Sequence, residues 1–245
     1  MIIRKIRLFL RDNKWMRVTI YPFVYKLVQK FHLRARLVQA YGPKALSLIQ
    51  NSAKESGIVV VPYYGTLLGL VREKSLLRHD ADMDFAIPIG EQNIGEFYAA
   101  LVNKGFLFEK FATRNNRLVE FSVRYKEVCI DFFLFGLNKK RDRNIFVFND
   151  RGEIRVHSYP LILGCEYVQT EYGQILIPIN SQGHLLNEYG EWRIPNKQWD
   201  ARRGPSFRKL LPPSNWKCEE SREIDVFENI LKLKPVLRIE EIDVE

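Results

Sequence analysis

The chain has few cysteines and no long apolar run. Its three cysteines, Cys129, Cys165 and Cys218, are far apart and match no zinc or redox spacing. We therefore expect reduced thiols in a cytosol-like compartment. The longest uncharged stretch, Ile58–Val71, contains proline and glycine and is shorter than the roughly 20 apolar residues that cross a bilayer. Basic residues interrupt the N-terminal apolar residues, which is unlike a secretory signal peptide. These absences predict a cytoplasmic protein without a spanning helix.

Internal repeats and low-complexity tracts are also missing. The 245 residues are 46% hydrophobic and 27% charged, which is ordinary for a soluble globular protein. Length alone favours one elaborated domain with a substantial core.

The net charge of +9 is concentrated at the N-terminus. Residues 1–36 contain ten Lys or Arg and one Asp, which leaves 28 basic and 28 acidic residues in the remainder. Apolar residues at helical spacing accompany these charges, so we expect a basic amphipathic helical arm. Such helices bind anionic membrane surfaces, but they can equally pack on a protein core with their charges in water. Nucleic acid is disfavoured, because the charge lies away from the candidate active site described below.

Helical and extended patterns are interleaved without strict alternation. This predicts an α+β fold in which helices pack against a mixed sheet. We expect helices over 43–54, 67–73, 92–104, 181–189 and 224–231, strands over 58–63, 83–87, 106–111, 117–125 and 128–135, and a hairpin at 150–152 within an otherwise loop-rich C-terminal part.

Acidic residues lie at the start of one expected strand and inside another. Asp82 and Asp84 would project to the same side of their strand, and Asp80 would join them if the extended backbone begins early enough. Asp131 lies in the apolar run Val128–Phe135, where an unpaired carboxylate would be costly. The economical solution places Asp131 beside the pair, with a cation between them. Carboxylate oxygens favour Mg²⁺ or Mn²⁺ over zinc.

A second element precedes these acids. Gly65 and Thr66 follow the strand 58–63 at the start of the helix 67–73. The free backbone N–H groups of a helix start and a hydroxyl can bind phosphate, although a structural cap is the commoner explanation. Arg72 could reach the same anion or pair with an acid. Gly-Thr, the acids at i and i+2, and an acid in a later strand together predict a nucleotidyltransferase fold.

The stretch YYGTLLGLVREKSLLRHDADMDFAI resembles the signature of the LicD/fukutin family. Asp80, Asp82 and Asp84 match the acids of that signature, Asp131 in CIDFFLF matches its later strand acid, and HLLNEYGEWRIP resembles its closing segment. The resemblance covers about residues 44–195. His79 stands where the family usually has Trp, and Leu76-Leu77-Arg78 replaces the usual Ile-Pro.

The resemblance implies transfer of a phospho-alcohol, such as ribitol phosphate, glycerol phosphate or phosphocholine, from a CDP-linked donor to a glycan hydroxyl. Asp82, Asp84 and Asp131 would hold the metal, and Asp80 is the first candidate for a general base, before His79 and Glu120. Two alternatives remain: a nucleotidyltransferase that acts on a sugar phosphate or other small acceptor, and a non-catalytic protein with a structural metal.

The last third of the chain combines tryptophans with basic residues. Aromatic faces and guanidinium groups suit a sugar, a base or a diphosphate, so Arg202 and Arg203 are candidates for substrate binding; the tryptophans can also fill a small core. We expect an arm over residues 1–36, a catalytic domain over 37–215 and a helical tail over 216–245. The arm would hold the enzyme at the inner face of a membrane.

Overall fold

The computed structural model describes residues 21–88, 93–114, 117–150, 153–196, 199–200, 204–211 and 218–232, with side chains omitted at a few further positions. Its helices are α3 (Tyr21–Ser56), α4 (Tyr64–Arg72), α5 (Ile94–Asn103), α6 (Ser181–Tyr189) and α7 (Ile224–Lys232). Its strands are β1 (Val61–Pro62), β2 (Asp82–Pro88), β3 (Leu107–Arg114), β4 (Arg117–Tyr125), β5 (Val128–Leu137), β6 (Asn144–Asp150), β7 (Glu153–Tyr159), β8 (Cys165–Thr170), β9 (Gly173–Pro178), β10 (Phe207–Leu211) and β11 (Cys218–Ser221).

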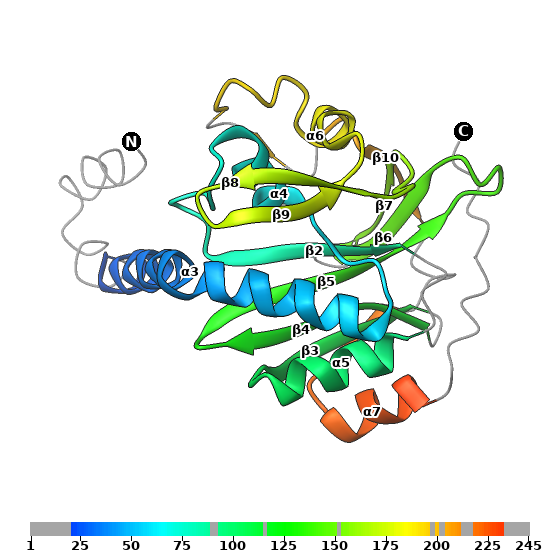
Figure 1. The fold of residues 1–245 in the computed structure, drawn as a ribbon, viewed down its shortest axis with the longest axis horizontal. Coiled ribbons are helices and arrows are strands. Elements are labelled where there is room, and N and C mark those ends of the chain that lie inside the picture. The colour runs from blue at the N-terminus through cyan, green and yellow to red at the C-terminus, as the bar shows by residue number, and fades with distance from the viewer. Residues whose placement is uncertain are drawn as a thin grey trace.

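One mixed sheet organises the described chain (Figure 1). Its path is β10-β7-β6-β5-β4-β3-β11, and β2 pairs with β5 and β1 beside this path. The pairing of β2 with β5 is parallel, whereas its neighbours β4–β5 and β3–β4 are antiparallel. A separate hairpin, β8–β9, lies apart from the main sheet. The predicted α+β class with a mixed sheet is confirmed.

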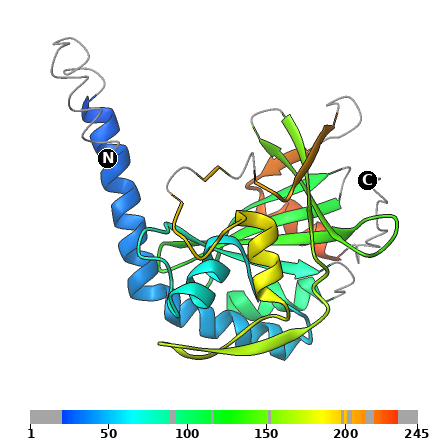
Figure 2. The ribbon, with the colours of Figure 1, turned by 90° about the horizontal axis from the view of Figure 1, so that it is seen from above.

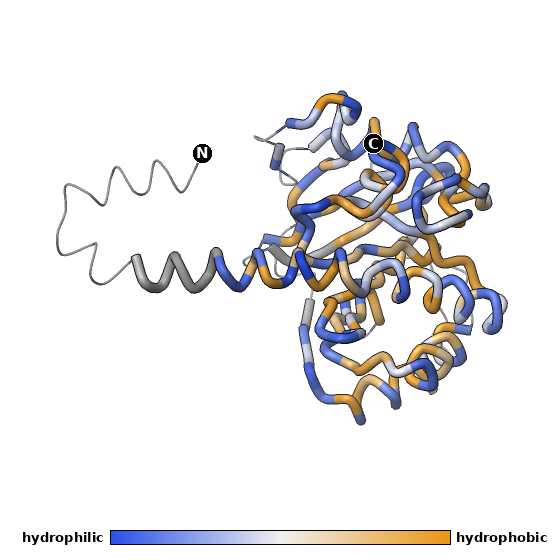
Figure 3. The backbone as a smooth tube through the Cα atoms, turned by 60° about the vertical axis from the view of Figure 1, so that its left-hand side comes forward, coloured by the Kyte–Doolittle hydropathy of each residue, from blue (hydrophilic) through white to orange (hydrophobic). Residues whose placement is uncertain are grey.

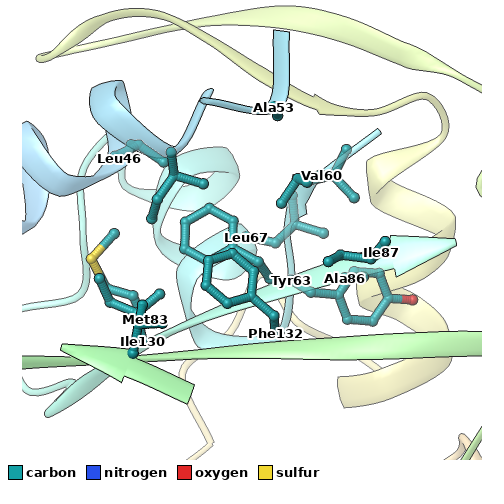
Figure 4. Packing of buried hydrophobic residues seen from close by; sticks show 14 of the residues in the cluster. Leu46, Ala53, Val60, Tyr63, Leu67, Met83, Ala86, Ile87, Ile130 and Phe132 are labelled. Atoms are coloured by element: carbon teal, nitrogen blue, oxygen red, sulfur yellow. The ribbon is translucent and has the colours of Figure 1, made fainter. Parts of the chain in front are cut away.

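The apolar core lies between the sheet and its helices (Figure 3 and Figure 4). Leu46 and Ala53 of α3 and Leu67 of α4 meet Met83 and Phe132 from the sheet (Figure 4). The ring of Phe132 stacks on Phe121 at 4.8 Å and meets Phe97 of α5 edge-on at 5.3 Å. Since side chains alternate along a strand, residues next to Phe132 project away from this core, and Asp131 is one of them.

Helix α3 is longer than the sequence suggested. It runs without interruption through residue 36, where we expected the arm to end, and through Pro43, where we expected a new helix. A proline inside a helix costs roughly 3 kcal/mol, but Ala45, Leu46 and Ile49 are fully buried just beyond it and offset that cost. Gly42 is needed for a close approach, because a β-carbon there would collide with Leu76. The first turns of α3 extend beyond the sheet (Figure 2).

The C-terminal part is more regular than expected. The hairpin β8–β9 and the strands β10 and β11 were all missed in a region that we interpreted as loops. The helix α6 was predicted with its bounds, and the β6–β7 hairpin is confirmed by its register, although its turn residues 151–152 lie outside the described ranges. Residues 218–232, expected in a tail, contribute β11 to the sheet and Phe227 to the core.

None of the helices in the described ranges is both long enough and apolar enough to cross a membrane. The first 20 residues of the expected arm lie outside the described part of the chain.

Candidate active site

The predicted acids lie on one face of the sheet. The parallel register of β2 and β5 places Asp84 directly opposite Asp131, with Asp82 one pleat earlier on the same side. Asp82 is exposed, whereas Asp84 and Asp131 are half-buried. The structure thus brings together the two acids of the Asp-x-Asp pair and the acid of the later strand, as the sequence predicted.

Strand β4 extends this polar face. Ser122 lies opposite Asp131 in the antiparallel register, is 1% exposed and donates a hydrogen bond from its hydroxyl to the Asp131 carboxylate. Glu120 lies two residues away on the same face, 3.5 Å from the Lys110 ammonium. Sequence analysis missed Ser122 because its partner is known only from the register of β4 and β5. An alternating serine and acid in the expected strand 117–125 were the available signal.

Crowding of these carboxylates perturbs their protonation. Loss of surrounding water raises the pKa of Asp82 to about 6, and the charges of Asp131 and Asp80 add to the shift. Loss of water, and then Asp82 and Asp131, raise the pKa of Asp84 well above its usual range. Loss of water also raises the pKa of Asp131, against the hydrogen bond from Ser122. In Glu120 it raises the pKa to about 7. A bound cation would relieve this repulsion.

The chemistry of these side chains fits a hard divalent cation, because all candidate ligands are carboxylate oxygens that repel one another. Across the described residues, however, no three His, Cys, Asp or Glu side chains form a ready-made metal-binding group. The assignment of Asp82, Asp84 and Asp131 as ligands of Mg²⁺ or Mn²⁺ therefore stays a prediction.

The two glycines of the Gly-Thr-Leu-Leu-Gly motif allow the loop 75–80 to lie close to α4. A β-carbon on Gly65 would collide with the carboxylate of Asp80, and one on Gly69 would collide with the backbone of Ser75 and Leu77. Gly69 therefore allows an approach of the backbone that a side chain would block, whereas a side chain at Gly65 would force the Asp80 carboxylate to move. The Asp80 carboxylate consequently lies at the first turn of α4, the place where a phosphate was expected.

Thr66 connects the same helix to β2. Its side chain is 2% exposed, and its hydroxyl oxygen accepts a hydrogen bond of 2.9 Å from the backbone N–H of Asp84. The structure therefore gives Thr66 a positioning role toward a predicted metal ligand. Phosphate binding by Gly65 and Thr66 stays a prediction.

Asp80 faces both the acids and a neighbouring histidine. Loss of water raises the pKa of Asp80, and the charge of His79 opposes that shift. The imidazole Nε2 of His79 lies 3.9 Å from the Asp80 carboxylate, and its side chain is 74% exposed. The Asp80 carboxylate thus lies close to Gly65 of α4, whereas His79 extends into solvent.

A pocket of about 300 Å³ opens next to Asp80 and Gly65. Its far wall is formed by the segment that follows α6 and includes Tyr189, Trp192 and Trp199. Tyr189 and Trp199 pack with their ring centroids 4.6 Å apart, and Arg193 covers the ring of Trp192 at 4.5 Å. We call this the aromatic pocket.

Arg72 holds the wall of the aromatic pocket in place. Its guanidinium donates to the backbone carbonyl of Trp192 at 3.1 Å and to the Glu73 carboxylate at 2.9 Å. The structure thus pairs Arg72 with Glu73 and with the pocket wall, and shows no ion pair between Arg72 and an acid of the site among the residues it describes. Arg202 and Arg203 lie outside the described residues, so their role in binding stays a prediction.

Behind the site lies a buried polar cluster that the sequence did not reveal. The hydroxyl of Tyr64 lies 2.9 Å from that of Tyr159, and the hydroxyl of Tyr63 lies 2.8 Å from Nδ1 of His184. Glu188 of α6 is 3% exposed; loss of water raises its pKa to about 7, while hydrogen bonds from Ser206 and Tyr159 oppose the shift. The contact between Tyr63 and His184 joins the start of α4 to α6, whose last residue, Tyr189, lines the aromatic pocket.

Comparison with known proteins supports the resemblance inferred from the motifs. Residues 57–161 match the family model described as LicD/FKTN/FKRP, nucleotidyltransferase domain. The ribitol-5-phosphate transferase FKTN of Macaca fascicularis is 26% identical over 193 residues, and that of Homo sapiens is equally similar. The matched region covers 76% of this chain and 40% of each relative.

Two solved structures are similar to parts of this fold. The crystal structure of ANT(2")-Ia in complex with adenylyl-2"-tobramycin is 14% identical, with a TM-score of 0.39 over 66% of this chain and 82% of that one. The Megavirus polyadenylate synthase is 16% identical, with a TM-score of 0.29 over 50% and 26%. The family match contains α4, β2 and β5, the three elements that carry the site. Over residues 57–161 the chain is therefore similar to the nucleotidyltransferase domain of the LicD/FKTN/FKRP family.

Proposed function

We propose that this protein is a metal-dependent phosphotransferase. It moves a phospho-alcohol, such as ribitol phosphate, glycerol phosphate or phosphocholine, from a CDP-linked donor to a hydroxyl of a glycan. The observation that carries the proposal is the parallel pairing of β2 with β5, which sets Asp84 opposite Asp131 and beside Asp82. The ribitol-5-phosphate transferases that match 76% of the chain support the type of group that is transferred.

Each part of the site has a role in this reaction. Asp82, Asp84 and Asp131 hold the cation, Ser122 orients Asp131, and the amide of Asp84 is fixed by Thr66. A bound Mg²⁺ or Mn²⁺ supplies neutralisation of the donor diphosphate and stabilisation of the leaving nucleotide. The aromatic pocket beside Asp80 receives the nucleoside, whose flat ring suits its apolar walls.

The transfer itself requires one proton acceptor. The acceptor hydroxyl oxygen forms a bond to the phosphorus of the phospho-alcohol, the bond from that phosphorus to the bridging oxygen breaks, and CMP leaves. Asp80 accepts the hydroxyl proton, because it lies beside the acids and loss of water raises its pKa, which makes its carboxylate a stronger base. A place at the cytoplasmic face of a membrane, held by the basic arm, completes the proposal.

A magnesium-dependent assay with CDP-ribitol, CDP-glycerol and CDP-choline tests this function. We expect CMP release from one donor by the wild type, loss of release in Asp82→Asn, and normal release in Glu166→Gln, which changes an exposed carboxylate on β8. The nucleotidyltransferase alternative predicts pyrophosphate release from CTP instead. A protein without either activity whose thermal stability responds to magnesium only when Asp82 is present would be the non-catalytic alternative.

A further inference from the structure

A second pocket is formed by α3 and the loop 76–80. The loop 76–80 is tied to α3 by Gln39, whose amide donates to the carbonyl of Leu77 at 3.1 Å. Between this loop and the helix lies a pocket of about 490 Å³, lined by His32, Arg36, Gln39 and Arg78 together with two alanines. We call this the arginine pocket.

Its charge is of one sign. Arg36 comes from α3 and Arg78 from the loop, and the lining contains no acidic residue. Within the part of the chain that the structure describes, no carboxylate forms an ion pair with either guanidinium. Two guanidinium groups that line one pocket without a carboxylate partner are suited to a phosphate, which accepts paired hydrogen bonds from such planar groups.

The arginine pocket flanks the candidate active site. Arg34, on the same helix, is near enough to Asp82 for its charge to lower the pKa of that carboxyl. Along the loop, Arg78 lines the arginine pocket, whereas His79 and Asp80 line the aromatic pocket. The two pockets therefore share one short loop, which contributes Arg78 to the arginine pocket and His79 and Asp80 to the aromatic pocket.

We propose that the arginine pocket binds a phosphate or diphosphate group other than that of the donor. This inference rests on the proposed function, in which the diphosphate of the donor is held by the metal acids and its nucleoside by the aromatic pocket. A second anion site therefore serves a second anionic group. Its source is either the phosphate that links a glycan acceptor to its carrier or the headgroup of an anionic phospholipid, and both present the same phosphate ester.

Inorganic pyrophosphate is the first probe, titrated calorimetrically in EDTA so that the metal acids do not hold it. We expect binding by the wild type and a loss of about tenfold or more for Arg36→Ala with Arg78→Ala, since each charge-assisted hydrogen bond is worth about that factor. Lys44→Ala with Lys54→Ala is the matched control, because both lysines are exposed on the same helix away from the pocket. Equal binding by the wild type and the arginine variant, or no binding by the wild type, overturns the proposal.

Vesicles distinguish the two sources. If the anion is a lipid headgroup, binding to phosphatidylcholine vesicles that contain phosphatidylglycerol falls tenfold or more in the arginine variant and is competed by pyrophosphate; exposed Phe31 and Leu33 on α3 would then face the lipid. If the anion belongs to the acceptor, vesicle binding is the same in both proteins while pyrophosphate binding is lost. The proposed function fails separately, by absence of CMP release from every donor, and that result leaves the pyrophosphate measurement unaffected.

Discussion

The two faces of the central sheet differ although the same strands form both. On the face toward α3 and α5, Phe85, Phe121 and Phe132 are fully buried and their rings pack together. On the other face the same strands present Asp84, Asp131 and Glu120, all with raised pKa values. Because side chains alternate along a strand, residues that stabilise the core are direct sequence neighbours of residues in the candidate site. Neighbouring residues should therefore give opposite phenotypes when they are changed.

Among changes to the face that carries the acids, Asp131→Asn should have the largest effect on activity. Removing one charge from the predicted metal-binding set should lower kcat by about 10³-fold or more, comparable to the loss of a preorganised electrostatic group in an active site. The free energy of unfolding should stay the same or rise, because repulsion among the acids is relieved. Steady-state CMP release and denaturant unfolding measure the two quantities. An unfolded variant would contradict the separation of the faces.

Phe132→Ala, one residue further, should show the reverse. The side chain is 0% exposed, so truncation should lower the free energy of unfolding by about 3–5 kcal/mol through lost burial and the cavity left behind. The folded fraction should keep a KM for the donor close to that of the wild type. Urea unfolding and assays normalised to folded protein test this, and Leu210→Ala, at a half-exposed position on β10, is the mild control.

Glu188 is an exception to this division between the faces, because it is buried although it lies on the same side of the sheet as the acids. Its folded-state pKa of about 7 exceeds the ordinary 4.5, so the folded protein binds more protons than the unfolded chain between these values. The free energy of unfolding should therefore fall as pH rises from about 4.5 to about 7, by up to about 3 kcal/mol, and then level off. Glu188→Gln should show a smaller fall than the wild type, because Asp82 and Glu120 still contribute theirs, as measured by urea unfolding at pH 5 and pH 8.

Two histidines act in the opposite direction and are common to both proteins. Loss of water lowers the pKa of His157 and His184 to about 4, so their contribution to stability is lost as pH falls from about 6.5 toward 4. Subtracting the free energy of unfolding of Glu188→Gln from that of the wild type at each pH cancels the contribution of these histidines, which both proteins share. Glu191→Gln, at an exposed position after α6, is the matched control. Identical pH curves for wild type and Glu188→Gln would remove Glu188 as the source.

The acids could be predicted from sequence because their signal is local. Asp82 and Asp84 are two residues apart before an apolar run, and Asp131 interrupts another apolar run. Strand alternation alone therefore predicts that each acid projects from the polar side of its strand. Ser122, Glu188 and Arg36 could not be found in this way. Each acquires its role from a partner that is distant in the chain, through the β4–β5 register, the packing of α6 or the docking of the loop 76–80 on α3.

The errors in the fold have a similar origin. We interpreted Pro43 as the start of a new helix, because proline is poor inside helices. In the structure Gly42 serves contact with Leu76, and burial of the following residues keeps α3 continuous. The strands β10 and β11 are short, and each is stabilised by a partner from elsewhere in the chain, β7 and β3 respectively. A local pattern therefore carries little information about them.

The parallel pairing of β2 with β5 also has a consequence for how the site assembles. The strands β3, β4 and β5 follow one another as antiparallel neighbours, and such local pairings form early because they close short loops. Asp84 and Asp131 are separated in the chain by α5 and two strands. We therefore expect these acids to meet among the last contacts of folding. The mutual repulsion of the carboxylates then opposes only this final docking step, after β3, β4 and β5 have already paired.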